Sequence, residues 1–259
     1  MIDSKYNKKH PFISIIIPTR NEEYHLERCL GSLVSNDYPK SRQELFIVDG
    51  GSSDGTLNIL EDFKDIIAKQ ISEPDNGIYD ALNKGIGLSS GDVVGFIHSD
   101  DMLATSKSLQ RIMSIFETKS IDAVYGDLDY VDRERPRKII RRWRSASFDR
   151  RRFFNGWMPA HPTFYLKREH YEKYGGYRTD MRISADYELM LRMLLKNNLK
   201  AEHIPEVLVN MRVGGASNIS LENRIQANKE DRMAWAVNEL KPRFYTSLLK
   251  PLSKLRQFV

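Results

Sequence analysis

The sequence has 259 residues, enough to bury a full hydrophobic core, and 41% of them are hydrophobic. Together with 29% charged residues and a net charge of +5, this is the composition of a globular protein, and it excludes a disordered or collagen-like chain. The single cysteine, Cys29, excludes an internal disulfide and fits a reducing cytoplasm.

Neither a signal peptide nor a membrane span is expected. Residues 1–10 are polar and lysine-bearing, without the apolar run that a secretion signal needs. The longest strongly apolar stretch, residues 12–18, is far too short to cross a bilayer. We therefore expect a cytoplasmic protein that is soluble or lies on the membrane surface.

Strands and helices alternate in the first part of the chain. The β-branched run at 12–17 predicts a buried strand that stops at Pro18. Apolar residues at helical spacing predict a helix over 22–34, with Asn21 as its N-cap. The same patterns predict strands at 45–48, 66–71 and 93–97 and helices at 56–63 and 78–88. Such alternation is typical of a mostly parallel sheet covered by helices on both faces.

The pattern changes after residue 101. We expect a helix at 106–116, a strand at 123–125 and an extended basic stretch at 137–143. A strand at 163–166, a helix at 185–195, a strand at 201–209 and a glycine-bearing loop at 211–217 follow. Two helical segments close the chain. No internal repeat and no low-complexity linker separates the parts, so a single compact unit is expected.

Polar side chains follow three of the predicted strands. Residues 18–21 follow the first strand, Asp49 and the turn 50–55 follow the second, and the adjacent Asp100 and Asp101 follow the fourth. In parallel sheets, ligands bind at the carboxyl ends of the strands. We therefore expect these groups to lie close together in the folded protein.

The turn after Asp49 matches neither common phosphate-binding loop. It has no Gly-Lys-Ser/Thr sequence, and Gly50-Gly51 lacks the spacing of the dinucleotide fingerprint. A strand-end aspartate such as Asp49 can accept hydrogen bonds from a nucleobase, and the glycines let backbone approach a flat ligand. The alternative, a turn that precedes a helix capped by Ser53 or Asp54, leaves Asp49 without a role.

The pair Asp100-Asp101 predicts a metal site. Adjacent carboxylates repel one another unless a positive charge lies beside them. Mg²⁺ and Mn²⁺ commonly take one or two carboxylates and fill their other positions with water and substrate phosphates. One aspartate would then bind the metal and the other a ribose hydroxyl. The alternative is that the pair caps the following helix.

Four further residues are candidates for the chemistry. Lys84 offers a point charge of the kind that balances a diphosphate. Asp186, near the start of a predicted helix, would act as general base towards a sugar hydroxyl, and His161 and Trp157 would shape a sugar pocket. The last three have structural alternatives, because an aspartate there also stabilises the helix dipole and single ring side chains often serve packing.

The ordered motifs at 15–22, 48–56, 83–85 and 99–101 together resemble the family 2 glycosyltransferases of the GT-A fold. The resemblance covers roughly residues 12–217, and residues 72–85 are similar to the subgroup that builds bacterial exopolysaccharide, colanic-acid-type capsule and O-antigen units. It implies an α/β GT-A fold, with a Rossmann-like, mostly parallel central sheet flanked by helices, a smaller acceptor-side subregion and C-terminal helices. Residues 1–240 would form one domain, with a nucleotide-sugar half at 11–104 and an acceptor half at 105–217.

The resemblance also implies residue roles. Asp186 would be the general base and Asp101 the ligand of Mn²⁺ or Mg²⁺. The nucleotide-sugar would be bound by Pro18, Thr19, Asn21, Glu22, Asp49, Gly50, Ser52, Asp54, Asn83, Lys84 and Asp100. The acceptor or sugar pocket would include Trp157, His161, Arg212 and Gly214, with Arg212 and the 214–217 loop closing over the donor. Two positions depart from the family pattern, since many relatives have acidic residues where this chain has His98 and Ala185.

The activity implied is an inverting transfer of one sugar from a UDP- or GDP-sugar to a hydroxyl of a glycan or polyprenyl-diphosphate-linked acceptor, in bacterial surface polysaccharide synthesis. The Gln-x-x-Arg-Trp motif of the processive synthases is absent, which favours single-sugar transfer. One alternative is a sugar nucleotidyltransferase, although the segment 19–22 lacks the glycines typical of that class. Another is a non-catalytic nucleotide- or glycan-binding module, which would need no base.

Two segments are strongly basic. Residues 133–152 contain ten Lys/Arg against two acidic residues, which indicates either an anionic partner or a solvated face. Residues 241–259 contain five basic residues and no acidic one, and their apolar residues lie mainly on one helical face. This amphipathic tail would rest on the cytoplasmic face of the inner membrane, or pack on its own domain or on a partner subunit of a homo-oligomer. No nucleic-acid partner is expected, because no recognised binding motif accompanies the charge.

Overall fold

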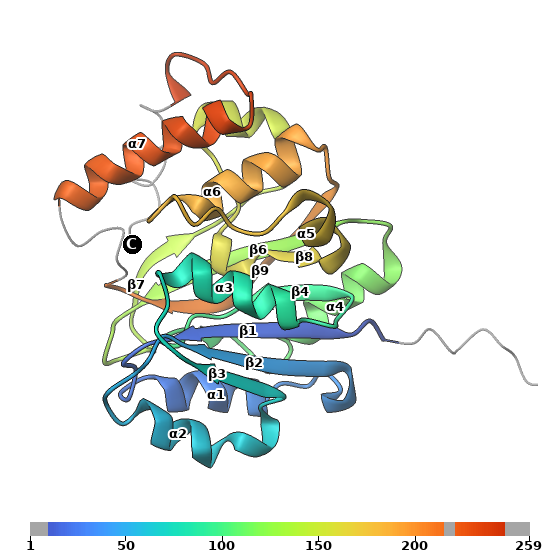
Figure 1. Cartoon of the computed structure of the whole chain (residues 1–259). Coiled ribbons are helices and arrows are strands. Elements are labelled where there is room, and N and C mark those ends of the chain that lie inside the picture. The colour runs from blue at the N-terminus through green and yellow to red at the C-terminus, as the bar shows by residue number, and fades with distance from the viewer. Residues whose placement is uncertain (1–9, 215–220, 247–259) are drawn as a thin grey trace, which may run out of the picture.

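The computed structural model describes residues 10–214 and 221–246, and nine strands within the first of these ranges form one mixed sheet (Figure 1). In chain order the strands are β1 (Ile13–Thr19), β2 (Gln43–Asp49), β3 (Lys69–Ser72), β4 (Val93–Phe96), β5 (Met102–Leu103), β6 (Ala123–Val131), β7 (Ile139–Trp143), β8 (Tyr165–Lys167) and β9 (Ala201–Arg212).

The helices of the same part of the chain flank this sheet. The α-helices are α1 (Leu26–Val34), α2 (Thr56–Asp62), α3 (Ile78–Leu88), α4 (Ser108–Thr118), α5 (Arg168–Tyr174), α6 (Ala185–Met190) and α7 (Leu221–Val237). Short 3-10 segments are η1 (Lys40–Arg42), η2 (Lys64–Ile66), η3 (Arg150–Asn155) and η4 (His161–Thr163), and a π-helical segment is η5 (Leu191–Lys196).

The first part of the sheet is parallel and brings its strand ends level. β2 lies between β3 and β1, and β4 pairs with the other side of β1, all in parallel. The register places Thr19 opposite Asp49, and Asp49 opposite Ser72. The segments that follow these strands therefore leave the sheet at one edge, as the sequence predicted.

β1 lies inside the sheet, between β2 and β4, and its side chains are shielded from water. All seven residues of β1 are buried, and each buried isoleucine stabilises the fold by roughly 1.5–3 kcal/mol relative to exposure. α3 packs against this strand at Gly85, where a Cβ atom would lie 2.3 Å from Cγ2 of Ile16. A larger residue at position 85 would push α3 away from the sheet.

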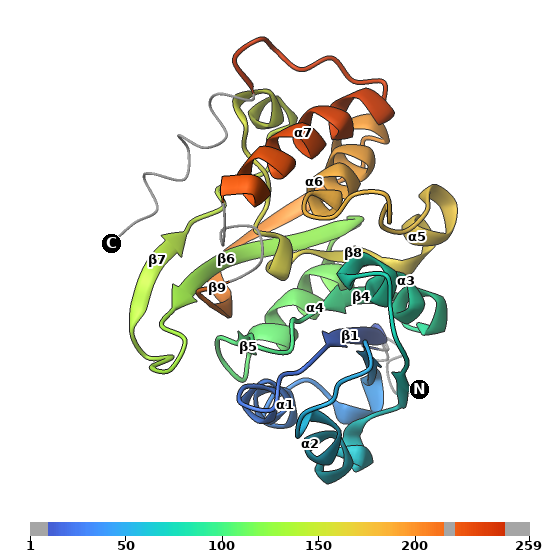
Figure 2. The same ribbon diagram turned by 60° about the vertical axis from the view of Figure 1, so that its left-hand side comes forward.

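The second part of the sheet mixes strand directions. β8 pairs antiparallel with both β4 and β6, β9 pairs parallel with β6, and β5 pairs antiparallel with β9. β6 and β7 form a long antiparallel hairpin that curves beside β9 (Figure 2). This hairpin carries the basic stretch that the sequence predicted to be extended.

α7 packs on α6, and Figure 1 shows α7 on the far side of α6 from β1–β3. Of the predicted amphipathic tail, only residues 241–246 are described, and 247–259 lie outside the described residues. The Thr246 hydroxyl donates to the carbonyl of Phe154 in η3 at 2.6 Å. Among the described helices, none combines the length and apolar character that crossing a membrane requires.

The start of the first helix differs from its prediction. α1 begins at Leu26 rather than at residue 22, and its N-cap is His25. Asn21 cannot be the N-cap, because it has the left-handed φ of 53° and lies before a separate turn.

Three elements of the second part also differ. β9 continues through Met211 and Arg212, so these residues belong to a strand and not to the predicted glycine-bearing loop. α6 gives way to a π-helical segment after Met190. α5 was not predicted, because its residues are mostly polar and its apolar periodicity is weak.

Candidate active site

The segment after β1 is tied to the turn after β2. The backbone N–H of Asn21 donates to the Ser52 hydroxyl at 2.8 Å, and the Asn21 side chain accepts from the N–H of Ser53 at 2.9 Å. The N–H of Gly50 donates to the carbonyl of Thr19 at 2.9 Å. Of the predicted donor-binding residues, this edge gathers Pro18, Thr19, Asn21, Gly50 and Ser52.

The carboxylates of Asp49 and Asp54 hold the turn after β2 in its conformation. Asp49 is fully buried, and its carboxylate oxygens accept from the hydroxyls of Ser52 and Ser72, each at 2.5 Å. Asp54 accepts from the N–H of Thr56 at 3.0 Å at the start of α2. In this structure both carboxylates hold backbone in place, and contact between Asp49 and a nucleobase stays a prediction.

Glu22 faces the acidic pair. Burial raises the pKa of Glu22 to about 7, and the negative charge of Asp100 adds to this effect. The positive charges of Arg133 and Arg212 oppose it. Glu22 and Asp100, which are both predicted donor-binding residues, are therefore brought together by the fold.

Asp101 is fully buried and accepts a hydrogen bond from Arg212 of β9. The backbone N–H of Arg212 donates to Oδ1 of Asp101 at 3.1 Å. The guanidinium of Arg212 donates to the carbonyl of Asp100, and its Nε donates to the carbonyl of Arg133 at 3.1 Å. Arg212 is 1% exposed and so places a buried positive charge beside the pair.

The chemistry of Asp101 fits a divalent metal ion. Its Oδ2 is buried and has no hydrogen-bond partner among the described residues. Burial, followed by the charge of Asp100, raises the pKa of Asp101 well above its usual range. A cation would favour the ionised carboxylate and satisfy this oxygen. No group of three or more metal-binding side chains occurs in the described residues, so water and phosphate oxygens would supply the remaining ligands.

Asp186, the predicted base, lies beside His161. Nδ1 of His161 is 3.2 Å from Oδ2 of Asp186. The ring of His161 packs edge-on against His98 and Trp143, with centroid distances of 6.0 and 6.4 Å. Burial lowers the pKa of His98, whereas the charges of Asp100 and Asp186 oppose this shift. His98 thus lies close to both the acidic pair and the predicted base.

Aromatic side chains of the β6–β7 hairpin lie near both Asp101 and Asp186. Tyr130 stacks on Trp143 with centroids 6.5 Å apart, and the guanidinium of Arg141 lies 4.0 Å above the Tyr130 ring. Burial raises the pKa of Tyr130 to about 12, Arg141 opposes this shift, and Asp101 and Asp186 add to it. Sequence reasoning did not name these three residues as site residues. For Arg141 and Trp143 the only signal was the mixing of aromatic and basic residues at 139–143, and Tyr130 lies outside that stretch.

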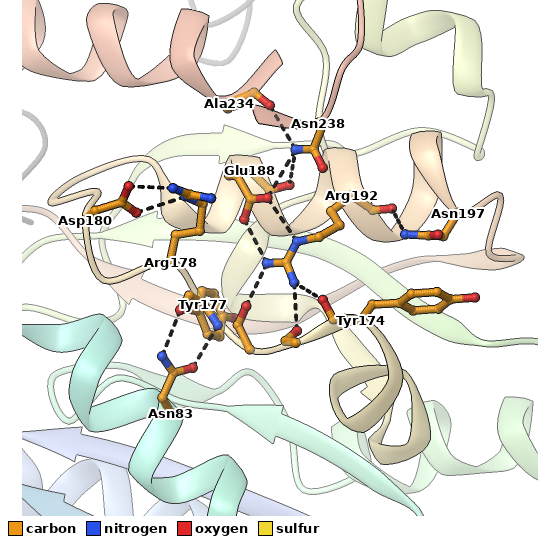
Figure 3. A network of polar contacts seen from close by, with 12 residues as sticks. Asn83, Tyr174, Tyr177, Arg178, Asp180, Glu188, Arg192, Asn197, Ala234 and Asn238 are labelled. Atoms are coloured by element: carbon orange, nitrogen blue, oxygen red, sulfur yellow. Dashed lines mark hydrogen bonds and ion pairs between the residues drawn. The ribbon is translucent and has the colours of Figure 1, made fainter. Parts of the chain in front are cut away.

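Two predicted residues of α3 are engaged by protein groups. Lys84 forms ion pairs with Glu73 at 2.8 Å and with Asp80 at 3.5 Å. The Asn83 side chain donates to the carbonyl of Tyr177 at 2.8 Å and accepts from its N–H at 2.7 Å (Figure 3). Asn83 therefore ties α3 to the segment after α5. Donor binding by either residue stays a prediction.

Trp157 is held in an aromatic cluster. Its indole N–H donates to the carbonyl of Ser145 at 2.5 Å, and its ring lies against Tyr125, Phe148 and Phe153. These contacts are packing contacts, and a contact with sugar stays a prediction for this residue.

Gly214 and Arg133 lie together beside the acidic pair. A Cβ atom at Gly214 would lie 3.3 Å from a guanidinium nitrogen of Arg133. Sequence reasoning counted Arg133 in the basic segment but did not assign it to the site. Residues 215–217 of the predicted closing loop lie outside the described residues.

The assembled site has two acidic centres with distinct chemistry. At the first centre, beside the buried Arg212, Asp101 would bind a metal cation, and Asp100 and Glu22 would bind polar groups of the donor. Asp186, held by His161, offers a carboxylate that would accept a proton.

Sequence comparisons identify the family. A family model described as "Glycosyl transferase family 2" matches residues 14–175. The chain is 32% identical over 213 residues to a PGL/p-HBAD biosynthesis glycosyltransferase of Mycobacterium bovis (strain BCG / Pasteur 1173P2), and the match covers 80% of either chain. It is 36% identical over 123 residues to the glycosyltransferase AglE of Haloferax volcanii, which covers 46% of this chain and 40% of AglE.

Solved structures match the fold. The structure of S. aureus TarS 1-349 in complex with UDP-GlcNAc gives a TM-score of 0.67 at 18% identity, covering 92% of this chain and 69% of that one. The mannosyltransferase PcManGT from Pyrobaculum calidifontis, in complex with GDP-Man and Mn²⁺, gives 0.66 at 22% identity, covering 95% and 70%. In a longer TarS structure the matched part is 41% of that chain. These matches confirm the predicted GT-A fold, and this chain belongs to glycosyl transferase family 2 and is a glycosyltransferase.

Proposed function

We propose that this glycosyltransferase transfers one sugar, with inversion, from a UDP- or GDP-sugar bound beside Asp100 and Asp101 to an acceptor hydroxyl that Asp186 deprotonates. One observation carries the proposal: His98, two residues before Asp100, packs on the ring of His161, and Nδ1 of His161 lies 3.2 Å from Oδ2 of Asp186. A donor centre and a base therefore flank one pair of histidines, an arrangement that a binding module or a nucleotidyltransferase would not need.

The nucleotide would lie at the carboxyl ends of β1, β2 and β4. Thr19, Asn21 and Glu22 border this edge on one side and Asp100 on the other. The bound UDP-GlcNAc and GDP-Man of the two solved relatives support a nucleotide-sugar donor. Arg212 and Arg133 lie where they would balance the negative charge of a diphosphate.

Asp101 would hold Mn²⁺ or Mg²⁺, which when bound supplies positive charge to the leaving nucleoside diphosphate. The unsatisfied Oδ2 of Asp101 and the Mn²⁺ in the PcManGT structure support this assignment. Asp100 would contact the ribose and sugar side of the donor.

Asp186 would accept the proton of the acceptor hydroxyl while that oxygen attacks the anomeric carbon. The contact of His161 with one oxygen of the carboxylate would help to orient Asp186 before substrate arrives. The bond to the nucleoside diphosphate would break on the opposite face of the sugar, which inverts the anomeric centre.

The acceptor would be a hydroxyl of a glycan or of a polyprenyl-diphosphate-linked sugar in bacterial surface polysaccharide synthesis. The exposed basic residues of the β6–β7 hairpin support an acceptor that carries phosphate. The enzyme would work in the cytoplasm, with its basic tail bringing it to the cytoplasmic face of the membrane.

A thermal-shift panel tests the donor. UDP-, GDP- and dTDP-sugars are each added to the full chain with Mn²⁺, with Mg²⁺ or with chelator. A UDP- or GDP-sugar is expected to raise Tm most, and only with metal, since a ligand that binds the folded state alone stabilises it by mass action. Equal Tm values with every nucleotide-sugar would contradict the proposal.

A further inference from the structure

The helix that carries Asp186 is held at its start by a carboxylate from α7. Oε1 of Glu230 accepts from the N–H of Arg182 at 2.9 Å, and Oε2 accepts from the N–H groups of Ile183 and Ser184, each at 2.8 Å. Glu230 is 3% exposed. Three consecutive amides just before α6 thus converge on one buried side chain.

This carboxylate lies just ahead of α6, and it bonds the N–H of the N-cap residue and of the two residues before it. Ser184 occupies the N-cap position, but its side chain makes no capping hydrogen bond. Exposed N–H groups and the helix dipole both favour a negative charge at such a terminus. Burial alone would raise the pKa of Glu230, but hydrogen bonds from Gln226 and the three amides outweigh it and lower the pKa, so the carboxylate stays ionised.

The same segment is held from the opposite side by α3. The hydroxyl of Tyr79 donates to the carbonyl of Ile183 at 2.8 Å. Tyr79 in turn stacks on Tyr177, with ring centroids 5.5 Å apart. The backbone at 182–184 is therefore fixed between a helix of the donor half and the C-terminal helix.

Contacts further along α6 are separate from this clamp. The indole N–H of Trp235 donates to the Tyr187 hydroxyl at 3.0 Å. The Asn238 amide donates to Oε1 of Glu188 at 3.1 Å, and Glu188 also pairs with Arg192 (Figure 3). Asn238, the residue after α7, therefore offers a matched control, because it joins the end of α7 to α6 and its hydrogen bonds do not involve the amides before Asp186.

We propose that Glu230 is a positioning residue that sets the place of Asp186 through the amides of residues 182–184. The inference rests on the proposed function, in which Asp186 is the base. α6 and the π-helical η5 that continues it have six residues each, and a helix this short is marginal on its own, so its first turn depends on external contacts. α6 and α7 both lie beyond residues 14–175, the range that the family model matches.

Hydrogen exchange tests the clamp without any substrate. In the full chain, Glu230→Gln removes the charge and one acceptor oxygen, and it is expected to raise amide exchange within 182–184 by about tenfold or more, because at least one of these amides loses its partner. Asn238→Ala is expected to leave exchange at 182–184 unchanged. Exchange like that of the wild type in Glu230→Gln would overturn the proposal.

Kinetics tests the positioning. With the donor that raises Tm most, turnover is followed as release of nucleoside diphosphate. Glu230→Gln is expected to lower kcat by roughly 10- to 100-fold while donor KM stays within about twofold, because a small misplacement of a reacting group is costly. Glu230→Asp, which keeps the charge, is expected to retain more of kcat than Glu230→Gln. An equal loss in Asn238→Ala would indicate a merely structural role and overturn the proposal.

A double variant separates this inference from the proposed function. In an Asp186→Asn background, Glu230→Gln is expected to cause no further loss, since residues that act as a unit are not additive. A further tenfold loss, on the scale of the single variant, would show that Glu230 acts independently of Asp186 and overturn the inference alone. Full turnover in Asp186→Asn would overturn the base assignment, and with it the inference.

Discussion

Nδ1 of His161 lies 3.2 Å from Oδ2 of Asp186, although the two residues come from separate elements, η4 and α6. A carboxylate has about four lone-pair sites, so a contact at one oxygen restrains its orientation and leaves other sites to accept the proton of an acceptor hydroxyl. The same imidazole packs on His98, which the charges of Asp100 and Asp186 both influence. Through His161 and His98, the side chain of Asp186 is connected by direct contacts to the segment that carries Asp100 and Asp101.

Asp101→Asn is predicted to abolish metal-dependent donor binding without harming the fold. The amide keeps an acceptor for the Arg212 N–H and removes a buried carboxylate whose pKa is raised by burial. Without metal, Tm at pH 8 is therefore expected to equal or exceed that of the wild type. The rise in Tm that Mn²⁺ plus donor produces in the wild type is expected to be absent in this variant, as measured by thermal shift. An unchanged rise would exclude Asp101 as the metal ligand.

Asn83→Ala is predicted to act on stability rather than on donor binding. The change leaves the N–H and the carbonyl of Tyr177 without their partner, which costs about 1–3 kcal/mol of unfolding free energy. The neighbouring Lys84→Ala removes surface ion pairs and is expected to cost at most about 1 kcal/mol. Urea denaturation compares the two variants. A loss of donor affinity in Asn83→Ala at unchanged stability would instead support the role implied by the family resemblance.

Glu22 is predicted to make stability fall as pH rises through about 7. Its pKa is raised from 4.5 to about 7 in the folded protein, so the folded state holds the proton more tightly than the unfolded state. The associated stability is fully present below the unfolded pKa and is lost as pH rises through the folded pKa. Glu22→Gln cannot titrate. Between pH of about 5 and 8, the Tm of the wild type should therefore fall relative to that of Glu22→Gln, and parallel curves would contradict this.

Much of the nucleotide half could be predicted because its signals are local, although the strand predicted at 66–71 begins only at Lys69, after the 3-10 segment η2, and β5 was not predicted. The β-branched run at 13–17 and the glycines around Asp49 mark strand and turn, and the helix predicted over 78–88 has the bounds of α3. The level strand ends follow from parallel pairing, so the neighbourhood of Asn21 and Ser52 was predictable without coordinates.

The second half was less predictable because its contacts are long-range. No local pattern pairs His161 with Asp186 or places the Glu230 carboxylate on the amides of 182–184, which lie 46 to 48 residues earlier. Nor does spacing show that the Asn83 amide is used by Tyr177, 94 residues away. Tertiary packing decides these positions, and a single sequence does not record it.

The most direct test of the central claim is turnover by Asp186→Asn. The substitution keeps the size of the side chain and removes its basicity, while leaving the donor edge at β1, β2 and β4 unchanged. We predict that kcat falls by about 10²- to 10⁴-fold, the contribution typical of a general base, and that donor Kd stays within about threefold. Wild-type turnover, or loss of donor binding together with turnover, would contradict the assignment of Asp186 as the base of this glycosyltransferase.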